Sequence, residues 1–416
     1  MINIFYNIYL NMNETSETNK KYKISKKILH KINNTNNIIE NLFKINNINV
    51  LENNINTRTI NINNESVILY PDIYNKTIEN ISIKKNLNGN KIILGQGHFG
   101  KVYNINSTNL PIVYKTIVQN INNEYSREDA VREYKSLKFQ YLLQLYLKFN
   151  EPFKLKYLCK LYEYGFINEQ NNFLNIYAIM ENCGKELGKY VIELKFNQTL
   201  NVKLIINIII ECAKGIKVLH DIGYIHLDIK PDNFLIKDDK IKIIDFGYTS
   251  KKNKLIYCGK PTYMAPEILK SNENYPANVK LDIFSLGCIF VMFLIILFEN
   301  LDEDIFDKIM VCPINKFKNN DTTLKIMEIR RNYNIELFKD DIKNIKISLE
   351  ENLPLNKHKK EYIENIIIIL NKMINPDIDE RYSDINELIY DLEEIHNFKN
   401  NVLKHRFSFT DLFRHK

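Results

Sequence analysis

A glycine-rich segment near residue 95 is the first part of the sequence whose residue types could do chemistry. Gly95, Gly97 and Gly100 form a G-x-G-x-x-G pattern that follows Leu94. Glycine lacks a Cβ atom, so such a backbone can lie close to phosphate oxygens and donate N–H groups to them. Alone the pattern is weak, because several unrelated nucleotide sites use glycine-rich turns. Strand patterns flank it on both sides, which favours a phosphate-covering hairpin over a Rossmann turn that opens a helix.

A lysine, Lys115, ends the apolar run that begins at Ile112. A lysine in this place is usually a solvent-facing charge. In a nucleotide site it would place a positive charge on the α- and β-phosphates, and a carboxylate from the following helix would hold it there. Glu133 is the expected carboxylate, and Glu128, about a turn and a half upstream on a similar helix face, is the alternative.

Two later motifs carry the most specific signal. Residues 226–233 read H-L-D-I-K-P-D-N, and residues 245–247 read D-F-G. With these motifs the chain resembles the eukaryotic protein kinase family, in which H-x-D-x-K-P-x-N is the catalytic loop and D-F-G is the metal-binding turn. The lysine of D-x-K-P-x-N is typical of serine/threonine kinases.

Further motifs extend the resemblance over about residues 88–397. An A-P-E motif occupies residues 265–267, and residues 282–287 resemble the start of the central helix of the family. Arg381 resembles the late arginine that pairs with the A-P-E glutamate. The resemblance implies an α+β, two-lobe protein-kinase-like fold, with a small β-rich N-lobe (88–182) and a larger helical C-lobe (183–397).

The resemblance also assigns catalytic roles. Asp228 would accept or orient the proton of the attacking hydroxyl, and Lys230 would meet the γ-phosphate as charge develops on it. Lys115, held by Glu133, would fix the α- and β-phosphates. The implied activity is transfer of the ATP γ-phosphate to serine or threonine hydroxyls of protein substrates.

ATP and Mg²⁺ are the co-substrate and cofactor that the resemblance implies. Asn233 and Asp245 would supply hard oxygen ligands for Mg²⁺. Met180 would close the back of the adenine pocket, and residues 181–183 would form the hinge whose backbone binds the base. The residues expected around ATP are Leu94, Gly95, Gly97, Gly100, Val102, Val113, Lys115, Met180, Glu181, Cys183 and Leu235.

Two positions depart from the family pattern. Leu227 stands where many kinases carry an arginine that binds a phosphate on the activation segment. Its absence predicts activity that does not require phosphorylation between Gly247 and Ala265. Lys260 replaces a threonine that contacts the catalytic aspartate and lysine, which puts substrate positioning in doubt.

The elements that must position these residues follow in order along the chain. The patterns predict a helix from Glu128 to about Lys148, and the hydrophobic spine of the family would include Leu137, Phe246 and His226. Four runs predict strands: Lys91–Leu94, Lys101–Ile105, Pro111–Thr116 and Phe173–Met180. Long helical patterns follow residue 184 and include Leu204–Leu219, Ile283–Phe298 and Tyr362–Met373. Strands followed by helices agree with a two-lobe α+β layout.

The composition limits the function classes. The 416 residues are 45% hydrophobic with a formal net charge of +7, so a wholly disordered chain is excluded. The positive excess is too small to indicate a specific nucleic-acid partner. The 16-residue apolar run 283–298 is shorter than the roughly 20 residues that a spanning helix needs, which favours a buried core helix and no membrane segment. The sequence gives no indication of the oligomeric state.

The cysteines and the termini complete the expectations. Six scattered cysteines and an N-terminus without export-signal features predict an intracellular, cytoplasmic location, which would be a host cytoplasm if the chain is viral. The Asn/Ile-rich residues 1–87 are expected to be a poorly ordered extension, with a small folded cap as the alternative. Residues 398–416 form a basic and aromatic tail, either frayed or docked on a lobe.

Three functions fit these observations. An ATP- and Mg²⁺-dependent protein serine/threonine kinase fits best. A kinase-like nucleotide-binding pseudokinase that acts as a scaffold is the alternative, which Leu227 and Lys260 leave open. A small-molecule kinase of related fold is disfavoured by Arg381 and the A-P-E motif, which build a platform for protein substrates.

Overall fold

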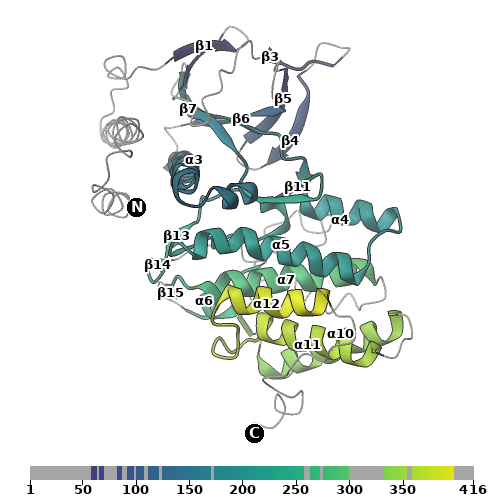
Figure 1. Cartoon of the computed structure of the whole chain (residues 1–416). Helices are drawn as coiled ribbons and strands as arrows, with labels where there is room; N and C mark the ends of the chain where they lie inside the picture. The colour runs from purple at the N-terminus through teal and green to yellow at the C-terminus, as the bar shows by residue number, and fades with distance from the viewer. Residues whose placement is uncertain are drawn as a thin grey trace, which may run out of the picture. The chain divides into compact units, whose positions relative to one another are not determined.

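The computed structural model describes most of the chain from residue 58 onward. The described residues are 58–62, 65–69, 82–86, 91–97, 100–106, 111–120, 124–169, 173–256, 263–271, 275–298, 331–332, 334–353 and 358–397. A β-rich part comes first and a helical part follows (Figure 1), as the sequence predicts.

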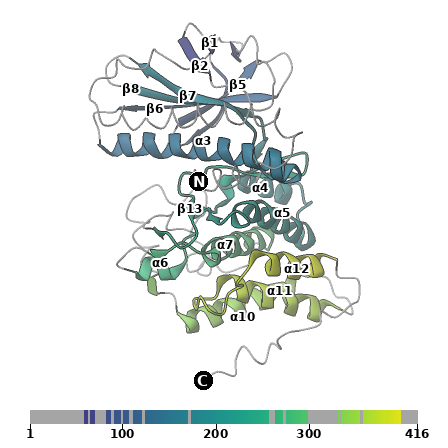
Figure 2. The ribbon, with the colours of Figure 1, turned by 60° about the vertical axis from the view of Figure 1, so that its left-hand side comes forward.

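A six-stranded antiparallel sheet forms the N-lobe. Its order is β3-β5-β6-β8-β7, with β4 paired to β5. Helix α3, Glu124–Asn150, lies along one face of this sheet (Figure 2). The strand bounds are β3 Ser82–Ile83, β4 Ile93–Gly97, β5 Gly100–Asn106, β6 Ile112–Asn120, β7 Leu161–Glu169 and β8 Phe173–Glu181.

Strands that the sequence did not predict precede residue 88. Because β3 pairs with β5 and Ile83 is buried, the sheet includes residues before the expected boundary at 88. Two further strands, β1 Arg58–Ile62 and β2 Glu65–Leu69, pair with each other, and β2 lies against β7. Part of the region that was expected to be poorly ordered is therefore a hairpin, while residues 1–57 lie outside the described part.

The C-lobe is built from helices around α7. Its described helices are α4 Leu187–Phe196, α5 Val202–His220, α6 Pro266–Lys270, α7 Val279–Leu297, α10 Ile335–Asn352, α11 Lys359–Ile374 and α12 Ile385–His396. α7 contacts α4, α5 and α11. Asparagine caps begin two of these helices: the side chain of Asn201 accepts a hydrogen bond from Leu204 N–H at 3.0 Å, and that of Asn278 accepts one from Lys280 N–H at 3.0 Å.

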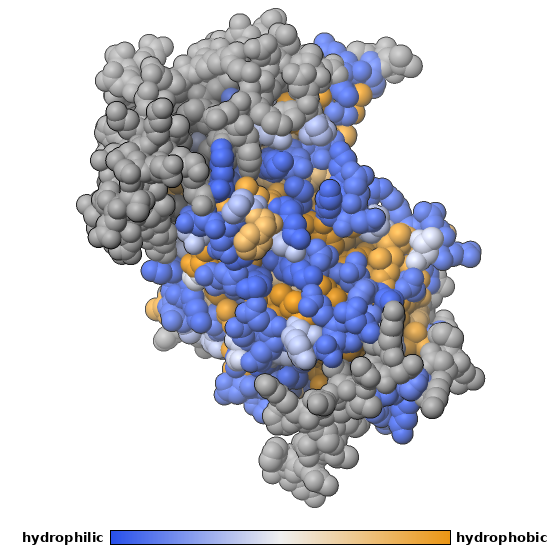
Figure 3. All heavy atoms as spheres, in the orientation of Figure 1, coloured by the Kyte–Doolittle hydropathy of each residue, from blue (hydrophilic) through white to orange (hydrophobic). Residues whose placement is uncertain are grey.

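Helix α7 is apolar on all sides and forms the centre of the C-lobe core. By length and composition it could cross a membrane, but 83% of its apolar window is buried inside the protein. This burial agrees with the prediction of a core helix. Gly287 permits the close packing, because a Cβ atom there would lie 2.5 Å from Cγ2 of Ile374 on α11. In the view of Figure 3 mostly hydrophilic residues cover the described surface, with smaller hydrophobic areas between them.

Short strands between β8 and α7 carry the loops of the site. β9 Lys185–Glu186, β11 Phe234–Lys237 and β12 Lys240–Ile243 form one sheet in the order β12-β11-β9. β10 Tyr224–Ile225 pairs with β13 Ser250–Lys251, and β14 Leu255–Ile256 pairs with β15 Tyr275–Pro276. The 226–233 loop therefore lies between β10 and β11, and the 245–247 turn lies between β12 and β13.

Candidate active site

Lys115 and Glu133 meet where α3 lies against the sheet. Lys115 Nζ donates a hydrogen bond to Glu133 Oε1 at 2.6 Å. Lys115 belongs to the central strand β6, where it pairs with Val102 of β5 and Ala178 of β8. Two neighbouring strands thus fix the backbone of the lysine, and the bond is made by the carboxylate that the sequence favours over Glu128.

A single buried carboxylate holds the backbone of the 226–233 loop. Asp282, at the beginning of α7 and 1% exposed, accepts hydrogen bonds from the N–H groups of His226 and Leu227, each at 2.8 Å. His220 Nε2 lies 2.9 Å from the same carboxylate. Leu227 has φ 66°, a left-handed conformation that costs an L-residue about 1–2 kcal/mol. Two short hydrogen bonds to this buried side chain hold that conformation.

Three functional side chains of this loop converge on one another. Lys230 Nζ donates to Asp228 Oδ2 at 2.5 Å. Asn233 Nδ2 donates to the Asp228 carbonyl at 2.7 Å and to Oδ2 at 2.9 Å. These bonds fix the orientation of the Asp228 carboxylate and leave its Oδ1 as the oxygen that can accept from a substrate hydroxyl. The amide oxygen of Asn233 keeps its capacity to bind a cation.

Asp245 follows β12 in a tight turn. Its φ is 63°, and Gly247 N–H donates to its Oδ1 at 3.3 Å. Phe246 N–H donates to Ser136 Oγ of α3 at 3.0 Å. The turn is therefore held both by its own hydrogen bond and by the helix that carries Glu133.

The charged side chains of the site shift one another's pKa values. Burial would lower the pKa of Lys115, but Glu133 and Asp245 more than offset this and raise it. Burial would also lower the pKa of Lys230, but the neighbouring Asp228 carboxylate more than offsets this and raises it. Burial would raise the pKa of Asp245, yet Lys115 and Lys230 hold it below its usual range. Both cations and the Asp245 carboxylate are thus ionised at neutral pH, which suits phosphate and metal binding.

Aromatic packing joins the lobes beside the turn. The ring of Phe246 lies 5.5 Å from that of Phe139 and 5.6 Å from that of His226, centroid to centroid. Leu137, which the family resemblance places in this spine, is also buried. The sequence did not single out Phe139 for this contact, although it lies within the helix predicted from Glu128 to about Lys148.

The residues expected around ATP lie along neighbouring strands of the N-lobe and on β11. Gly97 pairs with Gly100 in the β4–β5 hairpin, whose residues 98–99 lie outside the described part. A Cβ atom at Gly100 would lie 2.3 Å from the carbonyl oxygen of Thr116, so this close approach requires glycine. The branched apolar residues of this set lie in four strands: Leu94 in β4, Val102 in β5, Val113 in β6 and Leu235 in β11.

Hydrogen bonds from β12 and from the residue pair before β7 hold the hinge. Met180, the last residue but one of β8, has a buried side chain, and the Glu181 carboxylate accepts from Lys242 Nζ of β12 at 2.8 Å. The Cys159 thiol donates to the Glu181 carbonyl at 3.4 Å. The second lone pair of this oxygen can accept a further hydrogen bond. Hydrogen bonding with Cys159 and burial raise the pKa of the Cys183 thiol, so Cys183 acts as a packing residue and not as a nucleophile.

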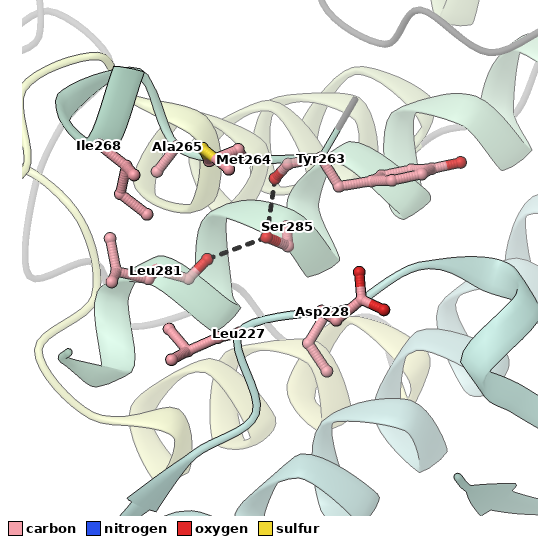
Figure 4. Close-up of a pocket in the computed structure, with 9 residues that line it drawn as sticks. Leu227, Asp228, Tyr263, Met264, Ala265, Ile268, Leu281 and Ser285 are labelled. Carbon is pink, nitrogen blue, oxygen red and sulfur yellow. Dashed lines mark hydrogen bonds between the residues drawn. The ribbon is translucent and has the colours of Figure 1, made fainter. Parts of the chain in front are cut away.

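A small pocket lies beside Asp228 (Figure 4). Ser285 Oγ donates to the Tyr263 carbonyl at 2.7 Å and anchors the segment above the pocket to α7. Leu227 contributes apolar surface where the family usually has a charge. The lining residues are Leu227, Asp228, Ile229, Tyr263, Met264, Ala265, Ile268, Leu281 and Ser285.

The A-P-E glutamate pairs with the late arginine, as the resemblance implies. Arg381 donates to both oxygens of Glu267, at 2.7 and 2.8 Å, and its Nε donates to the Asn375 carbonyl at 2.6 Å. Its guanidinium also lies 4.6 Å from the ring centre of Phe284, which stands where the family usually has tryptophan. Lys260, the other departure from the pattern, lies outside the described residues.

Comparison with known proteins agrees with this geometry. The family model "Protein kinase domain" matches residues 89–395. A probable serine/threonine-protein kinase, fnkE of Dictyostelium discoideum, is 28% identical over 346 residues, which are 77% of this chain and 25% of that protein. The serine/threonine-protein kinase atg1 of the same organism is 36% identical over 135 residues, 30% of this chain and 19% of that protein.

A plant protein kinase is also similar in sequence to this chain. Mitogen-activated protein kinase homolog 1 of Petunia hybrida is 29% identical over 204 residues, 47% of this chain and 49% of that protein. In each of these three cases the chain spans about half or less of the length of the relative. The predicted two-lobe fold is confirmed, and the chain belongs to the protein kinase family.

Proposed function

We propose that the chain is an ATP- and Mg²⁺-dependent protein serine/threonine kinase. The observation that carries the proposal is the combination of three features in one site. These are the Lys115–Glu133 ion pair, the hydrogen bond from Lys230 to Asp228, and an ionised Asp245. Phosphoryl transfer requires mainly positioning and charge neutralisation, and these groups can supply both.

Each side chain has a defined task in this reaction. Asp228 orients the attacking hydroxyl and accepts its proton, while Lys230, already hydrogen-bonded to Asp228, neutralises charge on the transferred phosphoryl group. Lys115 fixes the α- and β-phosphates. Asn233 and Asp245 would hold Mg²⁺ through an amide and a carboxylate oxygen, a donor set that fits this hard cation. When bound, the cation would neutralise the phosphates.

ATP would bind beneath the β4–β5 hairpin. The backbone of Gly95, Gly97 and Gly100 would cover the phosphates. The hinge at 181–183 would bind the base, with apolar contacts from Leu94, Val102, Val113, Met180 and Leu235.

Serine and threonine residues of proteins are the proposed acceptors. The relatives named above are called serine/threonine-protein kinases or mitogen-activated protein kinases. The Glu267–Arg381 pair fixes α6 on the C-lobe beside the Asp228 pocket, which supports a platform for protein substrates over a small-molecule site. Leu227, in place of the family's arginine, favours a second candidate, a kinase-like nucleotide-binding scaffold.

The test is transfer of labelled γ-phosphate from ATP with Mg²⁺ to a generic basic protein. We expect incorporation on serine or threonine, and its loss in Asp228→Asn. The matched control is Asp238→Asn, an exposed aspartate in the β11–β12 turn whose positive φ asparagine also tolerates. A folded wild type that binds ATP but transfers nothing would favour the scaffold, and equal activity of Asp228→Asn would refute the assigned role.

Location and accessory segments are further proposals. We propose an intracellular, cytoplasmic location and accessory roles for residues 1–57 and 398–416. Fluorescent tagging of the full chain tests the location, and truncation of either segment with activity measured tests the roles.

A further inference from the structure

Helix α3 contacts all three residues that follow Asp245. Ser136 Oγ, on a side chain only 4% exposed, accepts the Phe246 N–H at 3.0 Å. The stem of Arg132 passes over Gly247, where a Cβ atom would lie 3.4 Å from Arg132 Cγ. The guanidinium carbon of Arg132 then lies 5.0 Å from the ring centre of Tyr248.

These contacts share one face of the helix with the Lys115 ion pair. Arg132 and Ser136 are one helical turn apart, so their side chains lie on the same side of α3. Glu133, which binds Lys115, lies between them in the sequence. One turn of α3 therefore holds the phosphate-binding lysine and the residues that set the direction of Asp245.

Asp245 needs such support because its conformation is unfavourable. Its φ of 63° lies in the left-handed region, where non-glycine residues persist only if surrounding contacts fix them. The N–H group of Phe246 is buried, so without Ser136 it would lose its acceptor. The cation over Tyr248 adds a contact that an apolar side chain in place of Arg132 would not make.

We propose that Ser136 and Arg132 are positioning residues that direct the Asp245 carboxylate toward the metal. This inference rests on the proposed function for the identity of the ligands, a nucleotide and Mg²⁺.

The test measures ADP binding to the full chain by calorimetry, once with Mg²⁺ and once with EDTA. In Ser136→Ala and Arg132→Met we expect the Mg²⁺-dependent gain in ADP affinity to fall roughly three- to tenfold, the range that one lost hydrogen bond or one lost cation–π contact gives. ADP affinity in EDTA should stay within about twofold, because these residues act on the metal ligand and not on the nucleotide.

Matched variants separate positioning from general stability. Tyr248→Phe keeps the ring beneath Arg132 and should bind like the wild type, whereas Tyr248→Leu should resemble Arg132→Met. Asp129→Asn removes the ion pair that Arg132 makes on the same helix but keeps its contact with the Tyr248 ring. This variant should retain the Mg²⁺-dependent gain in ADP affinity. Lys135→Ala, on the exposed side of α3, controls for substitution in this helix.

The outcomes are distinct. An unchanged Mg²⁺-dependent gain in both Ser136→Ala and Arg132→Met would overturn the proposal, as would equal losses of affinity with Mg²⁺ and with EDTA. The proposal would also be overturned if the ADP affinity of the wild type were the same with Mg²⁺ and with EDTA. If the wild type transfers no phosphate yet shows the gain and its loss in the variants, the proposal stands and only the kinase activity fails.

Discussion

Removal of one partner from the Glu267–Arg381 pair should destabilise the C-lobe strongly. The Arg381 side chain is 0% exposed and that of Glu267 is 13% exposed, so Glu267→Gln leaves a guanidinium charge buried without its counter-charge. Breaking a buried pair in this way costs about 3–5 kcal/mol. For a domain of about 300 residues, whose entropy of unfolding is about 2.1 cal/mol/K per residue, the lower value corresponds to a decrease in Tm of roughly 5 °C. Thermal unfolding followed by far-UV circular dichroism measures the change.

An exposed pair provides the control for this measurement. Lys280 Nζ lies 3.7 Å from Asp379, whose side chain is 91% exposed, so Asp379→Asn should change the stability by less than about 1 kcal/mol. The double variant Glu267→Leu/Arg381→Met should lose less than the two single variants together, because it leaves no uncompensated charge. Equal Tm losses in Glu267→Gln and Asp379→Asn, or strictly additive losses in the double variant, would refute the argument from burial.

Two further predictions concern regulation and pH. Because Leu227 carries no charge that could bind a phosphate, phosphatase treatment should leave the transfer activity unchanged; lost activity together with a phosphate mapped between Gly247 and Ala265 would contradict this. Burial alone would raise the pKa of Asp245, but Lys115 and Lys230 lower it, so its ionised form stabilises the fold above about pH 4, and this stabilisation is lost as the pH falls through the lower folded pKa. Asp245→Asn should therefore decrease Tm more at about pH 6 than at about pH 3, and an equal decrease at both would disprove the assignment.

Local patterns predicted the elements that are regular and apolar. Helices α5, α7 and α11 and strands β4, β5, β6 and β8 coincide within a few residues with the predicted runs. β7 was not predicted, because Glu163, Asn168 and Glu169 interrupt its apolar alternation, although Glu163 is buried in the fold. Strand β3, which lies before the expected boundary at residue 88, was not predicted either, since a two-residue strand has no readable period.

The candidate site was predictable where a motif carries it. The resemblance named Lys115 with Glu133 and Glu267 with Arg381, and the structure brings both pairs together. It did not name Ser136, whose partner Phe246 lies 110 residues away and offers only a backbone N–H. A contact between a common side chain and a distant backbone group leaves no pattern in a single sequence, so only the three-dimensional structure could show it.

The three groups that hydrogen-bond to Asp282 restrict the motion of the loop that carries Asp228. The amides of His226 and Leu227 and the ring of His220 all depend on a carboxylate that belongs to the core helix of the C-lobe. Local opening is easiest where a segment has few buried contacts and solvent-exposed hydrogen bonds, whereas His226 is fully buried and its N–H donates to a buried carboxylate. The amide hydrogens of His226 and Leu227 should therefore exchange with solvent mainly when the C-lobe unfolds, so the backbone beside Asp228 is as long-lived as the core.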